Sequence, residues 1–160
     1  MNELEIKVRI KVFNTLQQLP PAEQALMQAA KNALPNAYAP YSQFSVAAAV
    51  LLENGEILTG TNQENASYPA GICAEGTVLS VASALHPGVA IKKMAVTVKS
   101  ERHVISRPVS PCGICCQRIL EYETRFNSSI EIWMMGEEGE IYSVDSIKDL
   151  LPLNFSKADL

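Results

Sequence analysis

The sequence predicts a layered α/β/α domain in which helices cover a central mixed sheet of five strands. Segments with strand-like and helix-like patterns alternate along the chain, in the order β, α, β, β, α, β, α, β, α. The 160 residues are 48% apolar and 19% charged, which is enough apolar material for one core without covalent staples. We therefore expect a single domain over residues 1–160.

The first expected strand covers residues 3–13, followed by a helix over 22–34. Charged residues alternate in this strand with apolar ones, which are Leu4, Ile6, Val8, Ile10 and Val12. We expect an edge strand whose charged face meets solvent, since charged edges oppose sheet-to-sheet aggregation. The helix has apolar residues at helical spacing between Pro21 and Pro35, and proline cannot continue it.

A hairpin and a second helix are expected next. Residues 44–52 and 56–61 are rich in β-formers and flank Asn54 and Gly55, a pair that adopts the positive φ angles of a tight turn. Apolar residues at helical spacing predict the second helix over 73–85.

The last part of the chain predicts two strands and two helices. Residues 91–98 and 130–135 are short apolar runs typical of buried strands. Helical character resumes over 112–122, after Pro111, and a last short helix is expected over 143–151.

Composition and charge exclude several classes of protein. The longest apolar run, 46–52, is much shorter than the ~20 residues of a membrane span. Charged residues interrupt positions 1–12, where a secretion signal needs an apolar stretch. The formal net charge is −4, without a Lys/Arg block, which argues against nucleic acid and anionic membranes as partners. We expect a cytoplasmic protein that binds a small neutral ligand.

The four cysteines are Cys73, Cys112, Cys115 and Cys116. In a reducing compartment, such a cluster indicates a metal site or a catalytic thiol before a disulfide. Cys112 and Cys115 have the spacing at which two thiolates bind one zinc ion, and Cys73 is the strongest further candidate ligand. Cys116 projects about 100° away from Cys115 on a helix, so we expect it not to share that metal.

Three ligands leave one zinc position open for water, which is typical of a catalytic rather than a structural site. The helices at Cys73 and Cys112 are both expected to begin at a ligand, so that their N-termini lower the thiol pKa values. Glu75 would lie in the first turn beside Cys73, where its carboxylate can act as a general acid and base without binding the metal.

The ordered motifs of the chain resemble those of cytidine deaminases of the small, homotetrameric type. The all-cysteine signature of zinc-dependent nucleobase deaminases is present as Cys73-Ala74-Glu75 and Pro111-Cys112-Gly113-Ile114-Cys115. Further matching segments are 37–42, 44–46, 62–68, 108–115 and 150–152. The resemblance implies a cytidine-deaminase-like core over 21–155, with 1–20 as an N-terminal strand extension.

The resemblance also implies an activity. It is the zinc-dependent hydrolysis of cytidine and 2′-deoxycytidine to the uridines, with release of ammonia, in a homotetramer with one Zn²⁺ per subunit. Cys73, Cys112 and Cys115 would be the metal ligands and Glu75 the catalytic residue.

Five residues are expected from the resemblance to bind the substrate within one subunit. Phe44 should stack on the pyrimidine, and Asn62 and Glu64 should hydrogen-bond the ribose hydroxyls. The backbone near Ala66 and Ala74 should bind the edge of the base.

Two further residues, Tyr68 and Phe155, are expected to approach the site of a neighbouring subunit. Without the resemblance, Phe44 and Phe155 would be interpreted as core aromatic residues, and residues 62–65 as a polar loop.

The chain departs from the family at three positions. Arginine is usual where Gly76 and Cys116 stand, and glycine where Ala47 stands. Those arginines are thought to hydrogen-bond the ligand sulfur atoms, so their loss is expected to raise the pKa of water bound to the zinc. Arg118 is a candidate to compensate, although its helical direction differs.

The sequence is also compatible with two other functions. One is a catalytically weakened homologue that binds zinc and a nucleoside, and another is a deaminase of a different aminated pyrimidine nucleoside. An enzyme acting on polynucleotides would need a basic groove with stacking aromatic residues. A thiol redox enzyme would leave Cys73 and Glu75 without a role.

Overall fold

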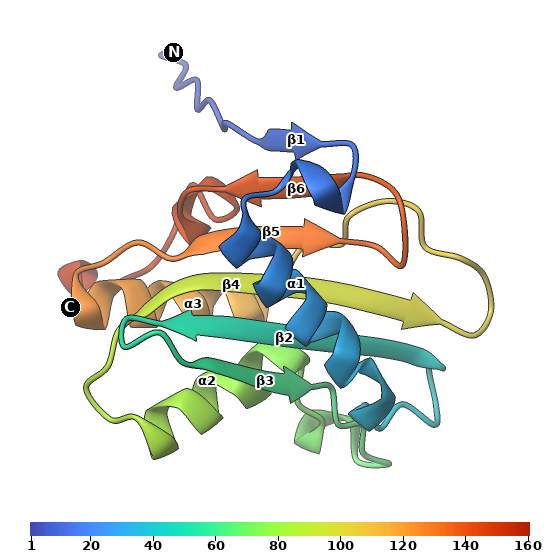
Figure 1. Cartoon of the computed structure of the whole chain (residues 1–160). Coiled ribbons are helices and arrows are strands. Elements are labelled where there is room, and N and C mark those ends of the chain that lie inside the picture. The colour runs from blue at the N-terminus through green and yellow to red at the C-terminus, as the bar shows by residue number, and fades with distance from the viewer.

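The computed structural model describes all residues from 1 to 160, and its six strands form one mixed sheet (Figure 1). The strand order is β1-β6-β5-β4-β2-β3. Only β4 and β5 run parallel, and the other neighbouring pairs are antiparallel. The strands are β1 (Lys11–Phe13), β2 (Phe44–Leu52), β3 (Ile57–Thr61), β4 (Ile91–Ser100), β5 (Glu131–Met135) and β6 (Ile141–Val144).

Helices cover both faces of this sheet (Figure 1). One face carries α1 (Pro21–Ala33), and the other carries α2 (Ala74–Leu85) and α3 (Gly113–Phe126). Short 3₁₀ turns occupy Leu16–Gln18, Leu34–Asn36, Tyr68–Ala70, Ile147–Asp149 and Lys157–Asp159. The layered α/β prediction is therefore confirmed. All the helices fall short of the length and apolar character needed to cross a bilayer.

The prediction of five strands is wrong, because β6 is a sixth strand. A helix was expected over 143–151, but Ile141–Val144 pairs with both β5 and β1, and only Ile147–Asp149 forms a helical turn. The apolar alternation that would mark this strand is broken, since Ser143 is fully buried in it. Gly139, at φ 90°, lies in the turn between β5 and β6 and provides a conformation that other residues rarely adopt.

The expected first strand is much shorter than residues 3–13. Only Lys11–Phe13 is strand, and residues 1–10 lie beyond the sheet without regular secondary structure (Figure 1). The reason is the length of its neighbour. Lys11 pairs with Ser143 in β6, and the chain that would face the earlier residues leaves the sheet after Val144.

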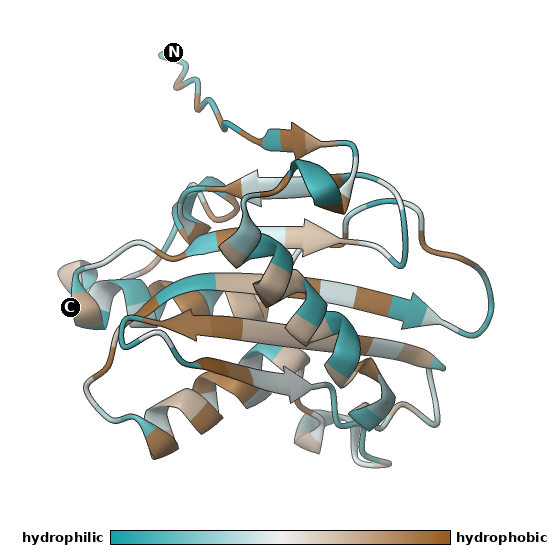
Figure 2. Cartoon of the chain, viewed as in Figure 1, coloured by the Kyte–Doolittle hydropathy of each residue, from teal (hydrophilic) through white to brown (hydrophobic).

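Two apolar clusters share the sheet. Eighteen buried residues pack between the sheet and α2 and α3, whereas nine pack on the α1 side. Because successive side chains of a strand point to opposite faces, Ala48 and Val50 of β2 join the larger cluster and Ala49 joins the smaller one. Figure 2 shows the apolar character of β2, which lies between β4 and β3. The larger cluster includes residues from the first turns of α2 and α3 and so fixes where these two helices begin.

Candidate active site

Cys73 and Cys112 occupy equivalent positions, each immediately before the first residue of a helix. Their backbones are extended, with φ and ψ of −73° and 156° for Cys73 and −70° and 166° for Cys112. The carbonyl of Cys73 accepts a hydrogen bond from the N–H of Thr77, and that of Cys112 from the N–H of Cys116. Neither side chain caps its own helix, so both sulfur atoms are available to a ligand.

The structure brings three of the four sulfur atoms together. The Sγ atoms of Cys73 and Cys112 are 4.0 Å apart, and those of Cys73, Cys112 and Cys115 all lie within 4.8 Å of one another. Two sulfur atoms bound to one zinc ion at about 2.3 Å in tetrahedral geometry are about 3.8 Å apart. This group of three thiols is therefore suited to hold one Zn²⁺.

The thiol pKa values in this group differ. Burial raises the pKa of Cys112, but hydrogen bonds from the backbone N–H groups of Cys115 and Ile114 and from the Cys115 thiol outweigh it, and the pKa is lowered. Burial and the nearby charge of Cys112 raise the pKa of Cys73. Burial also raises the pKa of Cys115, with a further contribution from Glu75. Backbone N–H groups at the start of α3 thus lower the pKa of Cys112, whereas burial and the neighbouring thiol dominate the pKa of Cys73.

Cys116 lies outside this group of thiols. It is 4% exposed, belongs to the larger apolar cluster, and its Sγ donates to the carbonyl of Pro111 at 3.5 Å. Its side chain thus points into the core rather than to the other sulfur atoms, as its helical direction predicts.

Gly76, in the first turn of α2, leaves room for a side chain of α3. The guanidinium of Arg118 occupies the space that a Cβ at residue 76 would fill. Arg118 therefore reaches the helix start that carries Cys73 and Glu75, despite its different helical direction.

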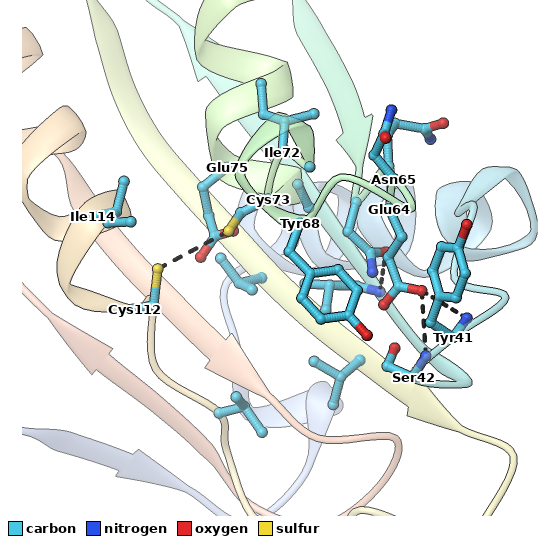
Figure 3. Close-up of a pocket in the computed structure, with 18 of the residues that line it drawn as sticks. Tyr41, Ser42, Glu64, Asn65, Tyr68, Ile72, Cys73, Glu75, Cys112 and Ile114 are labelled. Carbon is cyan, nitrogen blue, oxygen red and sulfur yellow. Dashed lines mark hydrogen bonds between the residues drawn. The ribbon is translucent and has the colours of Figure 1, made fainter.

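Glu75 is the buried carboxylate of this site. It is 4% exposed, and burial raises its pKa. The other two buried glutamates have polar partners, since Glu23 pairs with Lys93 and Glu123 accepts hydrogen bonds from two backbone N–H groups. Figure 3 shows the Glu75 carboxylate beside the sulfur of Cys73. It is thus placed to exchange protons with a molecule held at the thiols.

A cavity of about 690 Å³ extends from these residues to the loops after β3 and before β2 (Figure 3). Small-molecule sites usually have 300–1,000 Å³ and mostly apolar walls with a few polar groups. The walls here follow that pattern. The apolar walls include Val46, Ile72, Val96, Val98 and Ile114.

Two polar residues at the loop end of the cavity are fixed by backbone groups. Asn62 accepts from the N–H of Val46 at 2.8 Å and donates to the carbonyl of Phe44 at 2.9 Å. One oxygen of Glu64 accepts from the N–H of Tyr41 at 2.9 Å and of Ser42 at 3.3 Å. The Ser42 hydroxyl lowers the pKa of Glu64, with help from these N–H groups. Glu64 is therefore held as an anion.

Comparison with known proteins places the chain in a family. The family model described as "Cytidine and deoxycytidylate deaminase zinc-binding region" matches residues 20–127, more than half of the chain. The chain belongs to this family. The match includes the three clustered cysteines and Glu75, and it leaves residues 1–19 and 128–160 outside.

Several members of this deaminase family are similar over most of the chain. The cytidine deaminase of Sporosarcina psychrophila is 39% identical over 138 residues, which are 86% of this chain and 93% of that protein. That of Halalkalibacterium halodurans is 34% identical over 139 residues, 86% and 96% of the two chains. The crystal structure of cytidine deaminase from Burkholderia pseudomallei has a TM-score of 0.71 at 38% identity and covers 82% of this chain and 97% of its own.

The structure of this family member separates the expected substrate residues into two groups. Asn62, Glu64, Tyr68 and Ala74 line the cavity. The lining does not include Phe44, Ala66 and Phe155.

Tyr68, at the loop end, and Phe155, beside α3, are both exposed. Tyr68 is 79% exposed, and its ring lies edge-on to Tyr41 at 6.4 Å between centroids. Phe155 is 59% exposed, and its carbonyl accepts from the side chain of Gln117 at 2.8 Å.

Residues 41 and 42 have a role that the sequence did not indicate. Their N–H groups bind Glu64, and both residues line the cavity. The only signal was their place in the segment 37–42, which resembles the family without indicating a chemical role for backbone groups.

Proposed function

We propose that this chain catalyses the hydrolytic deamination of cytidine and 2′-deoxycytidine to uridine and 2′-deoxyuridine, releasing ammonia. The observation that carries the proposal is the buried Glu75 carboxylate beside three clustered thiols, at the end of a cavity large enough for a nucleoside. Relatives named cytidine deaminase support the choice of substrate.

Cys73, Cys112 and Cys115 would hold one Zn²⁺ per subunit. When bound, zinc supplies Lewis-acid activation of a water molecule. Glu75 would accept a proton from the attacking water and pass it to the N3 ring nitrogen as the C–O bond forms at C4. It would then take the proton of the new C4 hydroxyl and give it to the amine, so that the C–N bond breaks, the C4 carbonyl forms and ammonia leaves. The raised pKa of Glu75 favours both proton transfers, because the carboxyl can hold a proton between them.

The chain positions the nucleoside from the opposite end of the cavity. Asn62 and Glu64 are proposed to bind the ribose hydroxyls, and the fixed orientation of both side chains supports this role. The backbone near Ala66 and Ala74 would bind the edge of the base, and Phe44 would stack on it. Phe44 starts β2 beside the cavity, two residues before the lining residue Val46.

A homotetramer is proposed for the assembly, with Tyr68 and Phe155 reaching a neighbouring site. Their exposure supports this role, since each offers an aromatic ring to another molecule. A cytoplasmic location is proposed because free thiols of the metal site need a reducing compartment.

The test is the loss of cytidine absorbance with purified, zinc-loaded protein, combined with a zinc count. We expect one zinc per chain and turnover of both cytidine and 2′-deoxycytidine. No change at high protein concentration, with zinc stoichiometric and the nucleoside bound, would favour the weakened homologue that Gly76 and Cys116 suggest. Turnover of another aminated pyrimidine nucleoside alone would change the substrate.

A further inference from the structure

Residues 1–10 lie outside the sheet, and apolar side chains that are partly to fully exposed alternate along them and into β1. The alternating apolar residues are exposed by 82%, 45%, 43%, 44% and 53% at Leu4, Ile6, Val8, Ile10 and Val12. Figure 2 shows apolar and polar residues alternating along this segment. Single exposed apolar residues are common, but five on one face of an extended segment indicate an interaction surface.

The segment continues an edge strand. β1 pairs with β6 on one side only, and its other edge is free. Residues 1–10 also lie before residue 20, where the family match begins. The extension is therefore neither a part of the sheet nor a part of the matched deaminase region.

The charges of the segment are ordered along the chain. Glu3 and Glu5 come first, and Lys7 and Arg9 follow. Within the chain, the one ion pair of these four residues is Lys7 with Glu5 at 3.9 Å, with both side chains more than 80% exposed. Such a pair contributes little to stability, so the charges are available to a partner.

This order makes the segment complementary to itself in the antiparallel direction. With a two-fold axis at Ile6, Glu3 of one copy lies opposite Arg9 of the other, and Glu5 lies opposite Lys7. All four charged residues then face opposite charges, which stabilises an antiparallel pair of strands.

The other face of the same pairing is apolar. Leu4 lies opposite Val8, and Ile6 lies opposite its own copy at the axis. Cross-strand pairs of β-branched residues are favourable in antiparallel sheets. Because side chains alternate between faces, one register satisfies the charged and the apolar face together.

Neighbouring registers that preserve the faces are less favourable. Moving the axis to Lys7 keeps Glu5 opposite Arg9 but puts two lysines opposite each other. Moving it to Glu5 puts two glutamates opposite each other. Like charges that lie directly opposite are destabilising.

We propose that residues 3–9 of two copies of this chain pair as antiparallel strands about a two-fold axis at Ile6. The N-terminal segment is then an interface between copies, separate from the proposed catalytic function. The partner is a second copy because the complementarity lies within the segment itself.

The test is hydrogen exchange of the full, zinc-loaded chain at low salt, followed in peptides that contain residues 3–9. The variants are Glu3→Lys with Glu5→Lys, and Lys7→Glu with Arg9→Glu. The matched control combines all four substitutions and keeps the net charge of −4. None of the four residues lies in the cavity, so cytidine turnover and exchange in β2 and β4 should stay unchanged and report correct folding.

We expect exchange in residues 3–9 of the wild type and of the fourfold variant to be on the order of tenfold slower than in either double variant. The effect is modest, because a two-stranded ribbon alone is marginally stable. Equal exchange in all four proteins would overturn the proposal. Failure of the fourfold variant to recover protection would also overturn it, since the partner would then be another surface.

Discussion

The two ends of the cavity are built in different ways. At the thiol end, Cys115 and Glu75 are 0% and 4% exposed and stand in the first turns of helices that rest on the larger core. At the loop end, Tyr41 and Tyr68 are 47% and 79% exposed. Glu64 is held there by N–H groups that precede it by 22 and 23 residues. Local helix geometry thus positions the proposed catalytic carboxylate and thiol, whereas long-range hydrogen bonds position the residue proposed to bind the ribose.

The strongest test of this difference is Glu75→Gln. We expect a loss of turnover of at least about 100-fold, because the amide cannot accept a proton from water. Zinc should stay at one per chain, since Glu75 is not a proposed ligand. Absorbance at saturating cytidine and a metal count measure the two effects. A variant that keeps its activity would disprove the proton-transfer role.

The next test compares adjacent cysteines at the thiol end. Cys115→Ser should weaken zinc binding by more than the ~10–100-fold that is typical for loss of a residue supporting a ligand. Cys116→Ser should keep zinc, because the serine hydroxyl can still donate to the carbonyl of Pro111. Competition with a chelator measures both affinities. Equal losses would mean that Cys116 belongs to the metal site.

A smaller effect is expected at the contact between α2 and α3. Arg118→Ala should lower kcat/KM and zinc affinity by up to about fivefold, the size of an exposed charge interaction. Arg118→Lys, which keeps the charge, is its control.

Gly76→Ala is a second test of the contact between Arg118 and Gly76. It should displace the guanidinium and cause a similar loss, while the helix gains up to about 1 kcal/mol in the free energy of unfolding. Activity and stability would then move in opposite directions.

Unchanged zinc affinity and activity in Arg118→Ala would show that this arginine has only a packing role.

The smallest effect belongs to the loop end. The pKa of Glu64 is lowered from 4.5, so its stabilising contribution is present above about pH 4.5 and is lost as the pH falls through the folded pKa. Glu64→Gln should therefore lower the melting temperature at pH 7 by at most about 2 °C. This difference from the wild type should vanish in acid, and thermal scans from pH 7 to pH 3 measure it. A difference that persists at pH 3 would contradict the charge-based explanation.

Local patterns in the sequence predicted most of the elements well. The hairpin at Gly55 formed, with φ 89°, and α2 and α3 begin directly after Cys73 and Cys112. These features depend on the conformational preferences of a few consecutive residues. The end of α3 was predicted four residues early, because only Asn127, at φ 47°, stops that helix.

The sequence by itself determined the layered α/β class, the helix starts and the cysteine and glutamate pattern, because each depends on residues close together in the chain. Only the tertiary structure decided how these parts meet. It brought Cys73 within 4.0 Å of Cys112 across 39 positions, placed Arg118 over Gly76, and limited the first strand to three residues. Contacts between distant segments depend on which surfaces the sheet leaves free, and periodicity within one segment does not specify that choice.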